Sequence, residues 1–375
     1  MRKKALFIFG TRPEAIKMAP VVLYFKNYLN DIETRVCVTA QHREMLDQVL
    51  QFFEITPDYD LDLMKKNQDL HHLSARILTS LKPVLDDYKP DYVFVHGDTT
   101  TTMMSSIAAF YSGIKIGHVE AGLRTFDKHQ PFPEEINRQI TGRLTDFHFA
   151  PTEQAQENLI AENVDKKNIL LTGNTVIDAL FQGLEKLKKY KDAEIKNLES
   201  LLNFNKKIIL VTGHRRENFG EGFIRICKAL KTIAVKHPNV QIVYPVHLNP
   251  KVQKPVYDLL GDIPNISLIA PLGYPAFLWL MSKSFFIITD SGGVQEEAPS
   301  LGKPVLVMRD TTERPEAVKA GTVILVGTNE TKIVSQAEKL LTNKEHYNQM
   351  QKSHNPYGDG KASERIFNFI KNLDV

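Results

Sequence analysis

Short apolar runs recur along the chain, and each is followed by a segment with helical periodicity. In the first half these runs are ALFIF, TRVCVT, DYVFVHG, KIGHVE and DFHFAP, and in the second half they are KIILVTG, VQIVYPV, NISLIA, FFIITD, PVLVM and TVILVG. Strands that alternate with helices predict parallel sheets covered by helices on both faces. Because the runs are continuously apolar, we expect strands that are buried on both sides.

A Lys-rich helical segment without glycine, LEKLKKYKDAEIKNLESLLNFNKK, separates the two series of runs. We therefore predict one Rossmann-like, doubly wound domain over residues 1–180, a second over 205–355, and a helical connection over 181–204. We expect the amphipathic tail, residues 360–375, to pack back on the first domain. Ligands of open parallel sheets bind beyond the carboxyl ends of the strands, so the expected ligand site is a cleft between the two domains.

The stretch TDSGGVQEEAP follows the apolar run FFII and indicates a turn from a strand into a helix. Backbone amides and the hydroxyl of the Ser-Gly-Gly triplet at 291–293 suit the oxygens of a phosphate. Glu297 lies about one and a half helical turns further on, where a carboxylate suits ribose hydroxyls. Asp290 and Glu296 are expected to be structural, for example in helix capping.

Cationic residues follow three other strand ends. Arg12 and Lys17 flank the glycine turn after the first strand, which favours anion binding over an ordinary surface cap. His214 lies at the first strand end of the second half, where a nucleotide domain holds a diphosphate. Arg314 precedes a proline at a helix start, and an anion contact or an exposed cap explains it nearly equally well.

Three carboxylates follow strands or begin helices in the first half. Asp98 precedes a threonine run, so helix capping alone is an alternative explanation for it. Glu120 emerges from an apolar strand and needs a partner, for which Arg124 is one alternative. Glu134 and Arg138 are four residues apart, which is typical of an exposed ion pair. Taken together, the three carboxylates favour an acidic cluster at the ligand site.

Composition narrows the class of protein further. The chain has 375 residues and a net charge of only +3, too little to indicate nucleic acid or a membrane as the main partner. Its two cysteines lie in apolar stretches and make neither a disulfide framework nor a metal set, which fits a reducing compartment. The sequence lacks HExxH, a P-loop and an early GxGxxG, which argues against zinc, P-loop nucleotide and nicotinamide chemistry.

With these residues in place, the chain resembles the non-hydrolysing UDP-N-acetylglucosamine 2-epimerases over ten blocks in order. The blocks are FGTRPEAIKMAP, TAQHREMLDQVL, GDTTTT, VEAGLRT, PFPEEINR, GNTVIDAL, TGHRREN, DSGGVQEEAP, RDTTERPEA and NPYGDGKASERI. The resemblance implies two Rossmann-like domains arranged as in GT-B glycosyltransferases, a cytoplasmic homodimer, and no metal or nicotinamide cofactor. It also implies interconversion of UDP-N-acetylglucosamine and UDP-N-acetylmannosamine by anti elimination and re-addition of UDP through 2-acetamidoglucal, for surface polysaccharides.

The resemblance also implies roles for residues that match the motifs of the family. The implied catalytic residues are Asp98, Glu120, Glu134, Arg138 and His214. The implied substrate contacts are Arg12, Lys17, Phe277, Ser291, Gly292, Gly293, Glu297 and Arg314. Some relatives bind UDP-N-acetylglucosamine at a regulatory site, which Gln41, Gln68, Arg215 and His247 match, whereas Glu44 and Asn67 depart from it. The rival hypotheses are a GT-B glycosyltransferase, a hydrolysing epimerase and a nucleotide-sugar sensor without turnover.

Overall fold

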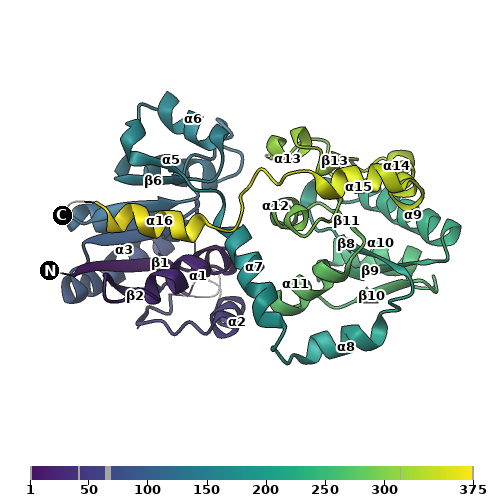
Figure 1. The fold of residues 1–375 in the computed structure, drawn as a ribbon, viewed down its shortest axis with the longest axis horizontal. Coiled ribbons are helices and arrows are strands. Elements are labelled where there is room, and N and C mark those ends of the chain that lie inside the picture. Colours follow the sequence, from purple (N-terminus) through teal and green to yellow (C-terminus); the bar gives the residue numbers. More distant parts are fainter. Residues whose placement is uncertain (1, 41–42, 64–68, 313, 374–375) are drawn as a thin grey trace. The chain divides into compact units, whose positions relative to one another are not determined.

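The computed structural model of the chain describes residues 2–40, 43–63, 69–312 and 314–373. The chain divides into two compact units, each with its own sheet (Figure 1). The first unit extends to Gln182 and resumes at Tyr357, and the second comprises Gly183–Pro356. The chain therefore passes between the units twice, once within helix α7 (Thr175–Leu187) and once just before Tyr357.

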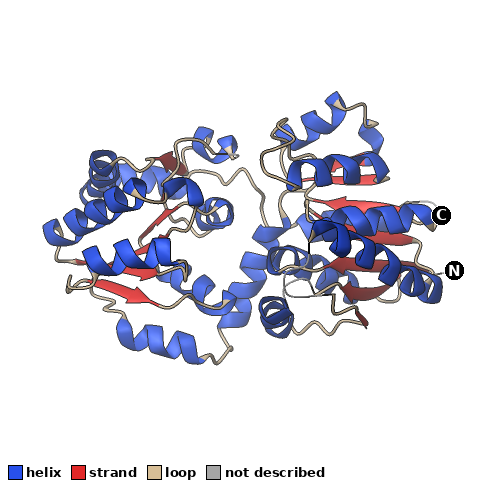
Figure 2. Cartoon of the chain, turned by 180° about the vertical axis from the view of Figure 1, so that it is seen from behind, coloured by secondary structure: helices blue, strands red, loops and turns tan. Residues whose placement is uncertain are grey.

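The first unit contains a parallel sheet with seven strands among the described residues, in the order β3-β2-β1-β4-β5-β6-β7. The strands are β1 (Lys3–Phe9), β2 (Ile32–Val38), β3 (Tyr59–Asp60), β4 (Tyr92–His96), β5 (Lys115–Val119), β6 (Phe147–Ala150) and β7 (Ile169–Leu171). Helices pack on both faces of the sheet (Figure 2). Besides α7, they are α1 (Arg12–Lys26), α2 (Arg43–Phe53), α3 (Leu70–Tyr88), α4 (Thr100–Tyr111), α5 (Glu134–Leu144), α6 (Glu153–Ala161), the short 3-10 helix η1 (Lys166–Asn168) and α16 (Ala362–Lys371).

Aromatic packing explains how the tail joins the first unit. The apolar run of β1 is fully buried, and the ring of Phe7 stacks on Phe94 of β4 with centroids 4.7 Å apart. Phe25 of α1 packs edge-on against Phe7 at 5.1 Å. Phe367 of α16 in turn packs edge-on against Phe25 at 5.0 Å. The last helix therefore belongs to the core of the first unit, although 174 residues of the second unit precede Tyr357.

The second unit repeats the same topology with six parallel strands among its described residues, in the order β10-β9-β8-β11-β12-β13. The strands are β8 (Lys207–Thr212), β9 (Val240–Pro245), β10 (Ile266–Ile269), β11 (Phe286–Thr289), β12 (Val305–Val307) and β13 (Val323–Leu325). The helices are α8 (Ala193–Leu201), η2 (Arg216–Asn218), α9 (Glu221–Lys236), α10 (Pro250–Leu260), α11 (Tyr274–Lys283), α12 (Gly292–Ser300), α13 (Pro315–Lys319), α14 (Glu330–Thr342) and α15 (Lys344–Lys352). The predicted fold class, two doubly wound parallel sheets, is confirmed.

Two strands of the structure are not predicted by the apolar pattern. These are β3 and β7, which lie at the two edges of the first sheet and are 2 and 3 residues long. An edge strand pairs on one side only and is often short. Strands as short as these contain too few apolar residues to be recognised from the sequence.

The segment predicted as a helical connection, residues 181–204, contains the end of α7 and all of α8. Helix α8 packs on α11, and the Glu194 carboxylate accepts the backbone N–H of Gly273 at 2.9 Å. The connection is therefore partly built into the second unit. Within the described residues, no helix combines the length and apolar character needed to cross a membrane.

Candidate active site

In both sheets the strand order reverses between the first and the fourth strand of the unit, β1 and β4 in one, β8 and β11 in the other. Ligands of such sheets bind beyond the strand ends at this switch point. Several of the residues predicted from the sequence lie in the loops at these positions or in the first turn of the helices that follow them.

A buried glutamate joins the two loops at the switch point of the first unit. Glu14 of α1 accepts the backbone N–H groups of Gly10 and Thr11 at 3.1 and 2.8 Å through Oε2. Its Oε1 accepts the hydroxyls of Thr99 and Thr102, from the loop after β4 and from α4, at 2.7 and 3.1 Å. The Glu14 carboxylate thus accepts hydrogen bonds from both sides of the switch point. It fixes the loop after β1 relative to the loop after β4.

Asp98 directs its side chain to Arg138 instead of capping a helix. The guanidinium of Arg138 donates to Asp98 Oδ2 at 2.6 Å, and Asn137 donates to the backbone carbonyl of Asp98 at 2.9 Å. Helix α4 is capped by Thr99, whose hydroxyl accepts the N–H of Thr102 at 3.1 Å. The capping explanation for Asp98 is therefore wrong, because its carboxylate pairs with Arg138 instead.

The surroundings of Asp98 raise its pKa. Burial is the largest cause; the charge of Arg138 acts in the opposite direction, and the negative charges of Glu120 and Glu134 add to the rise. The net result is a carboxyl group that binds a proton more readily than an ordinary aspartate. Its side chain is still 30% exposed, so a ligand can reach it.

Glu120 directly follows β5 and adopts a positive φ of 63°. Its Oε2 accepts hydrogen bonds from Lys17 and from the side-chain amide of Asn174, the latter at 2.9 Å, and lies 3.7 Å from Nε2 of His96. Burial raises the pKa of the Glu120 carboxyl, but the charges of Lys17 and His96, with their hydrogen bonds, outweigh burial and bring it well below the usual value. Glu120 is therefore held as a carboxylate.

The structure also decides the alternative partner of Glu120. Arg124 forms two hydrogen bonds with Glu162, at 2.6 and 2.8 Å, and its side chain is fully buried. The proposed ion pair between Glu120 and Arg124 is therefore wrong. Lys17, predicted as a substrate contact, donates a hydrogen bond to Glu120 in the structure.

Glu134 and Arg138 both lie on α5, but they do not form a solvent-exposed pair. Arg138 is only 9% exposed, and besides Asp98 its guanidinium lies 3.6 Å from a carboxylate oxygen of Glu135. Glu135 is fully buried, whereas Glu134, the first residue of the helix, is half-buried. The helix therefore buries Glu135 and Arg138 and presents Glu134 near Asp98, whose pKa the charge of Glu134 raises.

Arg12 is the remaining predicted residue of this switch point. It is the first residue of α1, directly after the loop whose backbone N–H groups Glu14 accepts, and it is half-buried. Burial lowers the pKa of its guanidinium from the ordinary value. A cation at the first residue of a helix, where backbone amides also point outward, suits an anionic ligand.

A buried carboxylate also fixes the loop at the switch point of the second unit. Asp290, fully buried after β11, accepts the backbone N–H groups of His214 and Arg215 at 2.9 Å each and the side-chain amide of Asn218 at 3.3 Å. Its other oxygen lies 3.4 Å from Nδ1 of His214. Asp290 is thus structural, but it holds the loop after β8 rather than capping α12, whose cap position is Ser291. The imidazole of His214 remains 46% exposed.

The start of α12 lies against a guanidinium group. Arg314 donates to Glu296 at 2.6 Å, and Glu296 is only 2% exposed. A Cβ placed on Gly292 would lie 2.6 to 3.1 Å from the guanidinium atoms of Arg314, so any larger residue there would displace this guanidinium. A fixed positive charge therefore lies beside the first amides of a helix, after Ser291, and both features attract an anion.

Two further predicted residues, Gly293 and Glu297, lie at this helix start, and a third, Phe277, lies on α11. The carboxylate of Glu297 lies 3.3 Å from the place of a Cβ on Gly293, so it turns back toward the beginning of α12. Burial, followed by the charge of Glu297, raises the pKa of Tyr274 well above its usual value. Phe277 lies on the same helix as Tyr274, α11, and is half-buried.

Two of the four residues assigned to a regulatory site can be placed. The ring of His247 stacks on His214 with centroids 5.5 Å apart and an angle of 17° between the planes. Arg215 is half-buried and follows His214. Gln41 and Gln68 lie outside the described residues.

Sequence reasoning assigned no role to several residues that shape these sites. Asn174, Asn137 and Glu14 each bind a residue or loop of the first switch point. Glu14 has a signal in the sequence, since it occupies the third helical position of a capping box that begins at Thr11. Asn174 and Asn137 have none, because their partners are 54 and 39 residues away in the chain. Within the described residues, no cluster of His, Cys, Asp and Glu is arranged to hold a metal.

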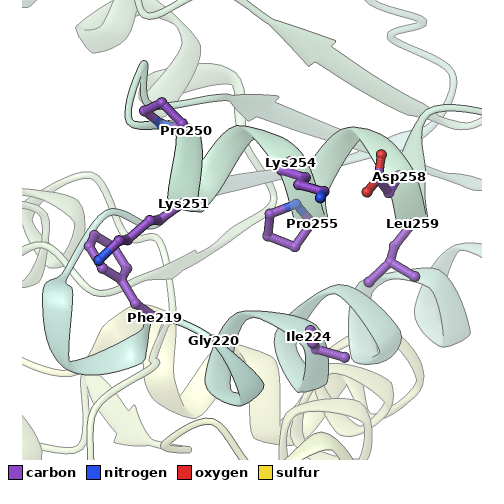
Figure 3. A pocket seen from close by; sticks show the side chains of 9 residues that line it. All are labelled: Phe219, Gly220, Ile224, Pro250, Lys251, Lys254, Pro255, Asp258 and Leu259. Carbon is purple, nitrogen blue, oxygen red and sulfur yellow. The ribbon is translucent and has the colours of Figure 1, made fainter.

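The second unit also has a groove of about 770 Å³ between α9 and α10 (Figure 3). None of the residues predicted from the sequence lines it. Its lining residues are Phe219, Gly220, Ile224, Pro250, Lys251, Lys254, Pro255, Asp258 and Leu259.

Comparison with known proteins agrees with this architecture. Residues 27–371 match the family model described as UDP-N-acetylglucosamine 2-epimerase. A UDP-N-acetylglucosamine 2-epimerase of Campylobacter jejuni is 60% identical over 375 residues, covering 99% of this chain and 98% of its own. One from Yersinia pestis is 59% identical over 374 residues and covers 99% of both chains.

Solved structures extend the similarity to the fold. The UDP-GlcNAc 2-epimerase of Neisseria meningitidis, bound to UDP-GlcNAc, has a TM-score of 0.89 at 53% identity, covering 98% of this chain and 99% of that one. The Methanocaldococcus jannaschii enzyme in complex with UDP-GlcNAc and UDP has a TM-score of 0.79 at 33% identity, with the same coverage. The chain belongs to the UDP-N-acetylglucosamine 2-epimerase family, a family of isomerases.

Proposed function

We propose that the protein interconverts UDP-N-acetylglucosamine and UDP-N-acetylmannosamine without hydrolysing them. Relatives at 59 to 60% identity carry the name of this activity over nearly their whole length, and a relative at 53% identity has been solved with UDP-GlcNAc bound. The second unit supplies what a nucleoside diphosphate needs, namely helix-start amides, Arg314 and His214. The first unit supplies three carboxylates, Asp98, Glu120 and Glu134, for the hexose.

The reaction needs both kinds of group because the hydrogen on C2 of the sugar has no neighbouring carbonyl. Removing it directly would leave an unstabilised carbanion. In the proposed route the C1–oxygen bond breaks first, UDP takes the bonding electron pair, and the positive character at C1 acidifies C2. A carboxylate then accepts the C2 proton, which leaves 2-acetamidoglucal. Protonation of the opposite face of C2 and attack of the UDP oxygen on C1 complete the epimerisation.

The observation that carries this proposal is the different pairing of two neighbouring carboxylates. Asp98 is bound by Arg138 and stays 30% exposed, whereas Glu120 is held by Lys17 and Asn174. The pKa of Asp98 is raised, chiefly by burial, and that of Glu120 is held well below its usual value by Lys17 and His96 despite burial. Two carboxylates whose environments separate their pKa values are typical of distinct acid and base roles. We assign Asp98 and Glu134 to proton handling and charge stabilisation in the elimination, and Glu120 to the re-addition.

The leaving diphosphate requires fixed positive charge. A positioned general base contributes only about 10² to 10⁴-fold to the rate. Much of the barrier must therefore be lowered by preorganised charge on the leaving group. Arg314, fixed by Glu296 beside Gly292, is the best-placed cation for this role among the described residues of the second unit.

Proton NMR of the protein with UDP-N-acetylglucosamine in D₂O tests the proposal. We expect UDP-N-acetylmannosamine to appear with deuterium at C2 in both epimers. Free N-acetylmannosamine would instead identify a hydrolysing enzyme. An unchanged spectrum would indicate a sensor or a transferase that needs an acceptor, and either result would overturn the proposal.

Three finer expectations accompany the proposed activity. The product would supply surface polysaccharides from a cytoplasmic enzyme, and light scattering of the purified protein is expected to give a homodimer. Regulation by UDP-N-acetylglucosamine would involve Arg215 and His247. A rate curve with UDP-N-acetylmannosamine alone tests it, because a hyperbolic curve unaffected by added UDP-N-acetylglucosamine excludes activation.

A further inference from the structure

Asn174 is the residue that joins Glu120 to the end of the first sheet. It lies between β7 and α7, is 3% exposed, and donates from Nδ2 to Glu120 Oε2 at 2.9 Å. Its backbone N–H donates to the carbonyl of Tyr357 at 2.6 Å, where the chain re-enters the first unit. The side chain that contacts Glu120 is thus fixed by two segments that are distant in sequence.

The orientation of the Asn174 amide is determined by its other end. Its Oδ1 accepts the backbone N–H of Val176, in the first turn of α7, at 3.0 Å. A backbone N–H is only a donor, so this atom must be the amide oxygen. The amide NH₂ group therefore faces Glu120, and it can only donate to it.

The two oxygens of Glu120 have different surroundings. Oε2 accepts from Lys17 and Asn174 and lies 3.7 Å from His96 Nε2. Oε1 lies 3.9 Å from the place of a Cβ on Gly97, the residue before Asp98. The donors from α1 and from the loop before α7 thus converge on one oxygen, beside His96 of β4, and the other oxygen faces the loop that carries Asp98.

We propose that Asn174 is a positioning residue, which holds Oε2 of Glu120 and so directs Oε1 toward the Gly97–Asp98 loop. The inference deepens the proposed function and rests on it, because it assigns the reacting oxygen of Glu120. Asn174 itself does not touch the substrate. Its second task is to favour the ionised form of Glu120, since a hydrogen bond donated to a carboxylate stabilises its charge.

Asn174→Asp is the decisive variant, because it separates this role from helix capping. Aspartate caps a helix as well as asparagine does, so the bond to the N–H of Val176 is kept. The donor to Glu120 is replaced by an oxygen, and two carboxylates then face each other. We expect kcat to fall about 100-fold, with KM nearly unchanged. The acid limb of the pH–rate profile should move up by about one unit or more, because a like charge disfavours ionised Glu120.

Asn329→Asp is the matched control, because Asn329 caps α14 through its Oδ1 and lies in the second unit. It should leave kcat, KM and the pH profile unchanged. Asn174→Ser gives a second measurement if the aspartate variant does not fold, since serine keeps a capping oxygen but is too short to reach Glu120. We expect about a tenfold loss in kcat from Asn174→Ser, without the upward shift of the acid limb.

A titration that does not depend on turnover separates the two proposals. Carbon-13 NMR of labelled glutamate carboxyls, with the Glu120 signal assigned from Glu120→Gln, should show a higher pKa for Glu120 in Asn174→Asp than in the wild type. A Glu120 pKa in Asn174→Asp equal to that of the wild type would overturn the positioning role. The same holds if the wild type is active and Asn174→Asp has the same kcat and pH profile. Absence of epimerisation by the wild type together with a shifted signal would overturn only the proposed function.

Discussion

The two switch points of this molecule share a topology, but the carboxylates proposed for sugar chemistry lie at the first and the groups proposed for the diphosphate lie at the second. In the first unit the loops beyond the strands present Asp98, Glu120 and Glu134. In the second unit the equivalent loops present the start of α12, Arg314 and the exposed ring of His214. The same order of strands therefore creates a loop site without deciding which sign of charge it attracts.

Despite this difference, the loops of both switch points are held in the same way. A buried carboxylate accepts two successive backbone N–H groups from the loop after the first strand of its unit, Glu14 in one and Asp290 in the other. Glu14 reaches this loop from α1, whereas Asp290 reaches it from the end of β11. In both units a carboxylate accepts the loop N–H groups beside a strand end. The carboxylate comes from a different position in the chain in each unit.

The largest expected effect is the loss of turnover in Asp98→Asn. Asparagine can still accept from Arg138, but it cannot take up a proton from C2. We expect kcat to fall about 10² to 10⁴-fold, while the Kd for UDP stays within about threefold of the wild type, because the nucleotide groups belong to the second unit. Deuterium exchange at C2 followed by NMR measures the first quantity, and calorimetry with UDP measures the second.

Asp165→Asn is a suitable control for Asp98→Asn, because Asp165 is an exposed carboxylate of the same unit that caps η1. It should leave both quantities unchanged. Full C2 exchange in Asp98→Asn would contradict the division of chemistry between the two switch points.

The sequence predicts the scaffold of this site better than its pairings. Strand ends can be located from apolar runs, and this is sufficient to place Asp98 at the first switch point and Glu120 at the end of the neighbouring strand β5. Pairing depends on which side chains the fold brings together. Arg124, four residues after Glu120, binds Glu162 instead, 38 residues away. Local spacing therefore suggests a partner, but tertiary structure decides it.

The same limit applies to residues without local signal. Asn174 has no spacing relation to Glu120, and only the parallel order of β5, β6 and β7 brings the two strand ends close. Gly292, by contrast, is predictable because a tight helix start after a strand favours glycine. The guanidinium of Arg314 that lies against this glycine is visible only in the structure.

A second expected difference between the units is their stability in acid. Burial lowers the pKa of His118 to about 3 and that of His148 to about 4, from an ordinary 6.5. The unfolded chain therefore binds protons that the folded unit rejects, and stability is lost as the pH falls below about 6.5. At pH 5 each group costs about 2 kcal/mol relative to neutral pH. The second unit has no buried histidine among its described residues.

Urea unfolding at pH 7.5 and pH 5, followed by a hydrogen-exchange pulse at one fixed pH, measures each unit separately. Peptides from β4, β5 and β6 should lose about 4 kcal/mol of protection between the two conditions, and those from β8 and β9 much less. His118→Gln should remove about half of the difference. Equal losses in both units would contradict this assignment.

Replacing the cation at α12 should weaken nucleotide binding. Arg314→Lys keeps the charge but loses the planar group that Glu296 fixes and that lies on Gly292. A charge-assisted hydrogen bond contributes about 1.5 to 3 kcal/mol, so the Kd for UDP should rise about tenfold to 100-fold. Gly292→Ala should act in the same direction by displacing the guanidinium.

The exposed Arg225, which binds Thr328 in the same unit, provides the control Arg225→Lys, with no expected change in UDP affinity. Calorimetry with UDP alone isolates this effect from the carboxylates of the first unit. An unchanged Kd in both Arg314→Lys and Gly292→Ala would exclude the start of α12 as the diphosphate site.

The smallest expected effects come from substituting the two buried carboxylates that fix the loops, Glu14 and Asp290. These substitutions distinguish the two units most directly. Glu14→Gln and Asp290→Asn each keep one oxygen for the loop amides and replace the other by an NH₂ group. In Glu14→Gln that group can turn to the hydroxyls of Thr99 and Thr102, which accept as well as donate. Each variant therefore loses a charge but little geometry, and we expect unfolding free energies to fall by only about 1 kcal/mol.

The functional consequences of these two variants should nevertheless separate. Glu14 fixes the loops beside Asp98, so Glu14→Gln should lower kcat about fivefold, the equivalent of about 1 kcal/mol, and leave the Kd for UDP unchanged. Asp290 fixes the loop of His214, so Asp290→Asn should raise that Kd by a similar factor and leave C2 exchange at saturating substrate nearly unchanged. If each variant altered both quantities equally, the two switch points would act as one site, and their division into sugar chemistry and nucleotide binding would not hold.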